Sequence, residues 1–450
     1  MGLGLSGLMF FPGCVDGDTL TSWLDGGRPW GEVHDWQPPF IAFLARFFRF
    51  WPFPPAISSF FWMTNLFYWS GVVLTIRRLR GRPALWLLGF VILGLFPSSF
   101  AILSQLFKDT MLATVLLLAY GLLVVAETEG RRWAWWSALV GLAFAIGFRH
   151  NAVFAVLPLL VWMIQIGRTR LAPKTFAHRC PDRWRQGLAV LLLLALVASP
   201  AGLVKRVSVA QSSYPIQQVW AFDLVGISVK ANQVYLPDVY QDYQEPSRLK
   251  GFYQPKASDL NENPLTLDNL RKLYTPWSVN NVYIFGEGKG LKYLDEPQEV
   301  AALRNAWLST LLHHPLYYLQ VRFDLIRHWL GFPRIFEAQA CLRAEDPMLD
   351  FTVPTNRQVP GFYRFLDRTV FGQGWFYSLV LVVASGLFWL QQQRWPDRCR
   401  YLTLSGGLYI LSFGIFSGSS EFRFFYWIVV LCGLMGFEAL VARTDTAGRG

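Results

Sequence analysis

Charged residues are scarce in this chain: 16% of its 450 residues are Asp, Glu, Lys or Arg, against about 25% in an average soluble domain. Hydrophobic residues make up 53% of the sequence and aromatic residues 16%. Cysteine is also rare, with five residues, and no repeat period is present. These values exclude a disulfide scaffold, a collagen-like chain and a disordered chain. The composition instead indicates an all-α polytopic membrane protein.

Nine segments are apolar enough to serve as transmembrane helices, which need about 20 mostly apolar residues. They are 56–76, 84–105, 110–126, 133–147, 152–166, 187–204, 369–390, 401–416 and 424–441. A tenth apolar segment, 2–11, is too short to cross alone and lacks the basic start and cleavage site of a signal peptide. We expect it to be a short or interfacial helix, or the end of a span that starts upstream.

The basic residues predict how these spans are oriented, because Lys and Arg collect in cytoplasmic loops. Five segments hold 17 Lys or Arg against five Asp or Glu. They are 77–82, 127–132, 167–186, 391–400 and 442–450. All five fall on one side if segment 2–11 runs outward and every later span alternates. The net charge of +11 is therefore explained by inner loops in contact with anionic lipid, and no nucleic-acid partner is predicted.

This topology leaves two long segments on the outer side and divides the chain into three parts. Residues 1–204 form an N-terminal transmembrane bundle whose first outer loop is 12–55. Residues 205–368 form an outer domain of mixed structure with amphipathic helices, and 369–450 form C-terminal transmembrane helices. In 316–330 the residues Leu316, Leu319 and Phe323 share one helical face, which predicts a helix on the membrane surface or packed on the outer domain.

Cysteine positions allow at most one disulfide in this arrangement. Cys180 and Cys399 would face the reducing interior and Cys432 lies in a span. Only Cys14 and Cys341 could meet in an oxidising compartment.

Acidic and aromatic side chains cluster in the first outer loop. The acids and the histidine lie within twenty residues, at Asp16, Asp18, Asp25, Glu32, His34 and Asp35, beside Trp23, Trp30 and Trp36. A carboxylate near an apolar wall has a raised pKa and can take a proton from an alcohol. Aromatic rings with acids are typical of sugar-binding surfaces, although an exposed loop can also simply be polar. The Asp16-Gly17-Asp18 spacing could hold a divalent cation, but no metal or other cofactor is predicted.

Basic residues lie at the outer ends of three spans, where unpaired cations are costly. The sites are Lys108-Asp109, the turn Arg149-His150-Asn151, and Arg423 before the last span. Together the cations could hold a phosphate at the outer membrane surface. The alternative is local ion pairing, of Lys108 with Asp109 or of Arg423 with Glu421. We expect His150 to hydrogen-bond within its turn.

The order of these motifs resembles one family over almost the whole chain. The matching strings are Phe11-Pro12-Gly13, Gly17-Asp18-Thr19, Asp35-Trp36-Gln37-Pro38-Pro39, Phe107-Lys108-Asp109, Arg149-His150-Asn151, His314-Pro315 with Tyr318-Leu319, and Phe422-Arg423-Phe424. They resemble the bacterial polytopic GT-C-fold glycosyltransferases, in the group of protein mannosyltransferase and lipid A aminoarabinose transferase-like enzymes. Within this group the chain looks most like an uncharacterised bacterial branch. Gln37 departs from the pattern of that branch, which usually has His at this position.

The resemblance implies a membrane enzyme of the bacterial inner membrane, with its active site facing the periplasm between the first outer loop and the outer domain. It implies a polyprenyl-phosphate-linked sugar as donor and an envelope lipid, glycan or protein as acceptor. It further implies that Asp18 acts as the base or orients the acceptor, and that Asp35 is a second catalytic acid, which supports either the loop or the acceptor. We infer from charge and location that Lys108, Arg149 and Arg423 hold the phosphate. The predicted substrate-binding set also includes Asp16, His34, Gln37, Asp109 and His150.

Three other functions fit parts of the sequence. A polysaccharide polymerase or ligase shares the many spans and large outer loop, but the acid cluster favours the transferase. A transporter would show internal repeats or paired interrupted helices, and the sequence has neither. A non-enzymatic scaffold of envelope biogenesis would fit the short first helix.

Overall fold

The chain is helical throughout the part that the structure describes. The computed structural model describes residues 1–52, 56–79, 81–171, 183–241, 264–285, 290–332, 365–366, 368–391 and 395–447. Within these ranges only helices and isolated bridges occur, with no β-strand. Five helices are long and apolar enough to cross a membrane, which marks the chain as a membrane protein. Among the described residues these stretches are Lys108–Glu129, Ala152–Leu171, Gln186–Ser208, Arg398–Phe416 and Phe422–Thr444. They contain α7 (Lys108–Glu129), α9 (Ala152–Ile166), most of α10 (Arg183–Ser208), α17 (Arg398–Phe416) and most of α18 (Tyr426–Ala447).

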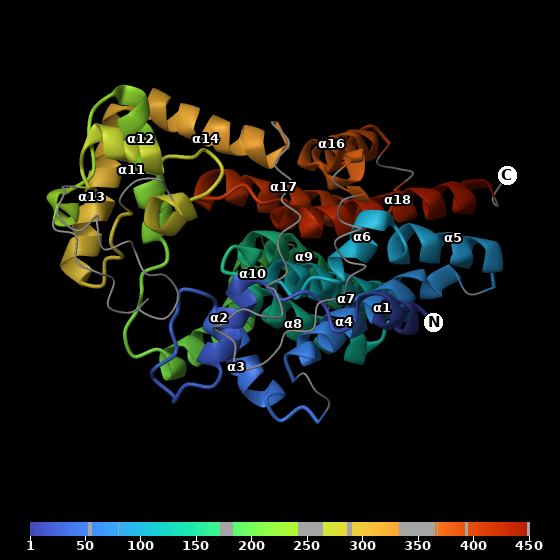
Figure 1. Cartoon of the computed structure of the whole chain (residues 1–450). Coiled ribbons are helices and arrows are strands. Elements are labelled where there is room, and N and C mark those ends of the chain that lie inside the picture. The colour runs from blue at the N-terminus through green and yellow to red at the C-terminus, as the bar shows by residue number, and fades with distance from the viewer. Residues whose placement is uncertain are drawn as a thin grey trace.

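Helix α7 is the centre of the bundle and is buried along most of its length. It packs on α4 (Ser59–Ile76) and α8 (Arg132–Phe148) (Figure 1). Gly71 of α4 and Gly121 of α7 allow this approach. A Cβ atom at Gly121 would lie 2.8 Å from the Gly71 carbonyl oxygen, closer than packed atoms approach.

One predicted span is two helices. Segment 84–105 divides into α5 (Pro83–Gly94) and α6 (Pro97–Ile102). The prediction of a continuous helix was wrong because Phe96 precedes a proline, which disfavours helical backbone at that residue, and its ψ is 127°. Helix α16 (Gly374–Leu390) likewise begins later than the predicted segment 369–390.

The short first apolar segment forms α1 (Gly2–Phe10), which packs on α4. Its Gly2 and Gly7 lie against Trp69 and Trp62 of α4. The nine residues of α1 therefore form a short helix that runs along part of α4.

The segment 205–368, predicted to lie outside and here called the outer segment, has a hydrophobic core of its own among its described residues, between Ala221 and Leu325. Its described helices are α11 (Gln217–Ala231), α12 (Leu267–Leu273), α13 (Pro297–His313) and α14 (Pro315–Trp329), which lie together at one end of the molecule (Figure 1). A mixed structure was predicted, but the described residues contain no strand. Val321, Arg322 and Leu325 of α14 are buried, whereas Leu316 and Phe323 of the predicted apolar face are exposed. This face therefore does not pack on the outer segment, and its exposure fits the other predicted position, on a membrane surface.

Contacts from this outer segment hold the turn between α17 and α18. Arg322 of α14 donates to the Ser417 carbonyl oxygen over 2.5 Å. The Ser420 amide donates to the Trp277 carbonyl oxygen over 2.9 Å. The Trp329 ring lies against Phe425, with ring centroids 4.3 Å apart. The outer segment is thus fixed over one end of the bundle, where the cavity described next is found.

Candidate functional site

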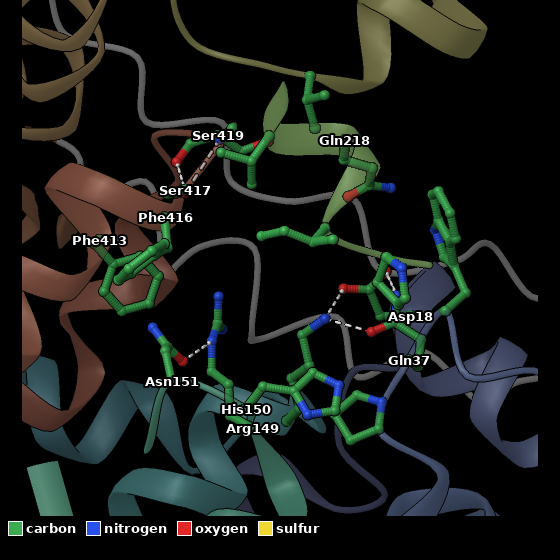
Figure 2. Close-up of a pocket in the computed structure, with 18 of the residues that line it drawn as sticks. Asp18, Gln37, Arg149, His150, Asn151, Gln218, Phe413, Phe416, Ser417 and Ser419 are labelled. Carbon is green, nitrogen blue, oxygen red and sulfur yellow. Dashed lines mark hydrogen bonds and ion pairs between the residues drawn. The ribbon is translucent and has the colours of Figure 1, made fainter. Parts of the chain in front are cut away.

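A cavity of about 640 Å³ lies between the first outer loop, the transmembrane bundle and the outer segment. Its walls come from α2 (Gly17–Asp25) and the residues before α3 (Pro39–Phe48), the start of α7, and the α8–α9 turn. The approach to α11 and the turn between α17 and α18 complete it (Figure 2). Six predicted site residues line it: Asp18, Gln37, Lys108, Arg149, His150 and Arg423.

Asp18 is held by three donors at the floor of this cavity. One carboxylate oxygen lies 3.1 Å from Lys108 Nζ and 3.1 Å from Arg423 Nη1. The other accepts a 2.8 Å hydrogen bond from Gln37 Nε2, while Lys108 donates to Gln37 Oε1 (Figure 2). Burial would raise the pKa of Asp18, but Lys108 and Arg423 bring it well below its usual range. Asp18 is therefore an ionised carboxylate and, while so clamped, a weak base.

Asp16 is the residue just before α2, and its carboxylate contacts the same Arg423 nitrogen as that of Asp18. Its carboxylate accepts a 2.8 Å hydrogen bond from the Thr19 amide, which caps the helix. The second oxygen lies 2.8 Å from Arg423 Nη1. Burial and the neighbouring Asp18 charge nevertheless raise the pKa of Asp16 to about 6. Asp16 lies outside the cavity lining and fixes the position of Arg423.

Arg423 has more carboxylate partners than any local pairing would give. It contacts Glu421 over 2.6 Å, so the predicted local pair exists, but it also contacts Asp16 and Asp18, some 400 residues away in sequence. The other predicted local pair, of Lys108 with Asp109, does not form. Lys108 pairs with Asp18, and Asp109 pairs with Arg149.

Arg149 and the buried Asp109 join the α8–α9 turn to the start of α7. Arg149 Nε also donates to Asn151 Oδ1 over 3.0 Å, and its guanidinium lies 4.4 Å from the Phe424 ring centroid. Burial lowers the pKa of Arg149 to about 10, so it stays charged at neutral pH. Asp109 does not line the cavity; it pairs with Arg149, which does.

His150 faces the cavity. The sequence had instead led us to expect a hydrogen bond between His150 and its own turn. Among the described residues its ring has no hydrogen-bond partner; the bond within the turn joins Arg149 to Asn151 instead. Burial within the site and the charges of Lys205 and Lys108 lower the pKa of His150 to about 4. His150 is therefore neutral at pH 7. His34 lies away from the cavity lining and contacts Asp25 over 3.2 Å.

Asp35 does not face the cavity. It is 1% exposed and contacts Lys205 Nζ over 2.8 Å, the Ser212 hydroxyl over 2.6 Å and the Ser213 amide over 2.6 Å. Burial opposes its ionisation, but these donors bring the pKa of Asp35 below its usual value. The geometry gives Asp35 a supporting position, one of the two that the resemblance allowed, rather than that of an acid in contact with a ligand.

Several lining residues were missed by the sequence interpretation, including Lys205, Tyr214 and Gln218. They lie where the last helix of the N-terminal bundle passes into the outer segment. Lys205 carried a detectable signal, because it is a cation at the end of an apolar segment, as Lys108 is.

Two further sequence predictions concern cysteine and metal. Cys14, two residues before Asp16, is disulfide-bonded. Its predicted partner Cys341 lies outside the described residues. In the described part of the chain no three His, Cys, Asp or Glu side chains group as metal ligands would. The carboxylates of Asp16 and Asp18 bind Arg423 and Lys108 instead.

We predict opposite pH effects for variants of two site residues. The pKa of Asp16 is raised, so its stabilising contribution is complete in acid and is lost as pH rises through about 6. The pKa of His150 is lowered, so its contribution is present above about 6.5 and is lost as pH falls. From pH 5 to pH 7, Asp16→Asn should therefore gain about 1 kcal/mol relative to wild type. His150→Gln should lose stability relative to wild type over the same interval.

The measurement is the apparent melting temperature of each variant and the wild type at pH 5, 6 and 7 in one detergent. Parallel curves for all three proteins would contradict the assigned protonation states.

No protein-family model matches the chain, and comparisons with curated proteins and with solved structures give no match either.

Proposed function

We propose that the chain is a membrane glycosyltransferase that moves a sugar from a polyprenyl-phosphate-linked donor to an envelope lipid, glycan or protein acceptor. The observation that carries the proposal is the convergence of Lys108, Arg149 and Arg423 with Asp18 on one cavity at the end of the helical bundle. Three cations suit a phosphate, and Arg binds phosphate oxygens in bidentate fashion. The cavity also has an aromatic wall, with Phe154, Phe413, Phe416 and Phe424, suited to the first isoprene units of a lipid.

The same contacts suggest how Asp18 becomes a base. A donor phosphate that binds Lys108 and Arg423 takes over the charges that hold the pKa of Asp18 low. The pKa of Asp18 then rises, and its carboxylate can accept the proton of the acceptor hydroxyl. The acceptor oxygen attacks the anomeric carbon as the bond from this carbon to the phosphate oxygen breaks. Lys108, Arg149 and Arg423 stabilise the charge that develops on the departing lipid phosphate.

We infer that the site faces the periplasm of a bacterial inner membrane. The disulfide at Cys14 supports this orientation, because disulfides persist in oxidising compartments and Cys14 lies beside the site. The basic segments between spans support it too, since they collect on the opposite side.

The test is mass spectrometry of envelope lipids and glycans from a strain that lacks the chain. The strain is re-supplied with wild type, Asp18→Asn or Asp268→Asn at equal membrane abundance. Asp268 is a matched control because its carboxylate is exposed and, within the described part of the chain, pairs only with the neighbouring Arg271. A sugar-bearing product should return with wild type and with Asp268→Asn but not with Asp18→Asn.

Two outcomes would contradict the proposal. If Asp18→Asn restores the product fully, Asp18 is not the base. If deletion changes no glycan or glycolipid, the chain is not a transferase.

A further inference from the structure

A strained tyrosine lines the cavity. Tyr214 has a φ of 48°, in the left-handed region that non-glycine residues seldom adopt because it is strained for them. The residue lies at the entry to α11, and its side chain forms part of the cavity wall. Such a conformation persists only where surrounding contacts enforce it.

Asp35 supplies those contacts. One of its oxygens accepts from the Ser213 amide and the other from the Ser212 hydroxyl, each over 2.6 Å. Lys205 lies 2.8 Å from the same carboxylate and compensates its charge. The Tyr214 amide in turn donates to the Ser212 hydroxyl over 3.3 Å. Asp35 therefore fixes the turn 212–214 and, through it, the Tyr214 ring.

The wall around Tyr214 differs in chemistry from the cationic floor. Trp36 follows Asp35 in sequence and also lines the cavity; its ring is held edge-on by Tyr293, with centroids 4.5 Å apart. The amides of Gln218 and Asn280 line the same cavity. Neither side-chain amide has a hydrogen-bond partner among the described residues; only the backbone amides donate, that of Asn280 to the Ser278 hydroxyl and that of Gln218 to the Pro215 carbonyl oxygen. Gln218 lies across the cavity from Arg149 and His150 (Figure 2).

We propose that Tyr214, Trp36, Gln218 and Asn280 form a sugar-binding subsite and that Asp35 is its positioning residue. Two aromatic side chains offer flat apolar faces to the C–H face of a sugar ring. Each free amide offers both a donor and an acceptor, which suits the paired hydroxyls of a sugar. None of the four is charged, so the subsite selects a neutral polyol and leaves the phosphate to the cations opposite. This inference rests on the proposed function and assigns the part of the cavity that recognises the sugar.

The experiment measures whether a sugar adds affinity to a lipid phosphate. The full chain in nanodiscs is titrated by native mass spectrometry with a polyprenyl phosphate. The titration is repeated with the same lipid carrying a neutral sugar, either glucose, mannose or galactose, as a phosphodiester. A third arm titrates methyl glycosides of the three sugars into the complex with bare lipid, which separates an acceptor sugar from the donor sugar. We expect at least one sugar-bearing lipid to bind the protein at least tenfold more tightly than the bare lipid does. Otherwise, we expect at least one methyl glycoside to bind the complex of the protein with bare lipid.

Variants then assign this preference to the proposed residues. Asn tolerates a positive φ, so Tyr214→Asn keeps the turn and removes the ring. It should reduce the sugar preference at least fivefold and leave the affinity for bare lipid unchanged, while Tyr214→Phe retains most of the preference. Asp35→Asn should also lose the preference, since Asp35 acts through the turn, and it should not weaken the binding of bare lipid, because Lys205 keeps its positive charge.

The outcomes separate this inference from the proposed function. If bare lipid binds and its affinity depends on Arg149, but no sugar adds affinity or Tyr214→Asn keeps the preference, the subsite is wrong and the transferase proposal stands. If bare lipid does not bind at all, the proposed function fails. A preference that needs Tyr214 but appears only with the methyl glycosides supports the subsite and makes the acceptor its occupant.

Discussion

Replacement of Arg423 by glutamine is expected to reduce sugar transfer by at least 10²–10³-fold, the usual cost of losing one charge-stabilising donor. The same change should lower the free energy of unfolding by about 3–5 kcal/mol. Arg423 lies within 3.1 Å of carboxylate oxygens of Asp16, Asp18 and Glu421, and its side chain is 11% exposed. Without the guanidinium these carboxylates repel one another in a site largely removed from water.

A second variant separates the two effects of Arg423. The double variant Asp16→Asn/Arg423→Gln removes one of the unpaired carboxylates together with the cation. Its apparent melting temperature should recover part of the loss, whereas its affinity for a polyprenyl phosphate should stay as low as that of Arg423→Gln. Affinity that recovers together with stability would show that Arg423 supports the fold and does not bind the ligand.

The charge pattern of the sequence predicted which cations gather at one end of the bundle, but not their partners. Lys108, Arg149 and Arg423 do line one cavity, as their predicted position on a single side led us to expect. Their pairing depends on contacts between distant segments. Lys108 contacts Asp18 rather than the adjacent Asp109, because successive residues on a helix point in different directions.

The support around Asp35 could not be predicted for a different reason. Ser212, Ser213 and Tyr214 form an unremarkable polar string, and nothing in their spacing signals a positive φ at Tyr214. Lys205 was assigned to the boundary of the outer domain, so its contact with Asp35 across 170 residues had no sequence signal. Local pattern predicts helices and charge sidedness, whereas hydrogen bonds between loops depend on tertiary structure.

Glu438 provides the second large effect. It lies within α18, is fully buried and contacts Arg78 over 2.6 Å and Arg398 over 2.9 Å, with Tyr120 as a further donor. A carboxylate within a span is costly unless paired, and removal of one partner of a buried ion pair typically costs about 3–5 kcal/mol. Glu438→Ala should lower the free energy of unfolding by that amount.

The matched control for Glu438 is Glu129, which pairs with Arg77 at the exposed end of α7. Glu129→Ala should change stability by no more than about 1 kcal/mol, as for other exposed ion pairs. Equal losses of apparent melting temperature for the two variants would contradict the role assigned to burial. The Glu438 cluster lies where α4 ends and α17 begins, at the opposite end of α17 from the cavity residue Phe416. Glu438→Ala protein that remains folded should therefore bind a polyprenyl phosphate with unchanged affinity, whereas Arg423→Gln should not.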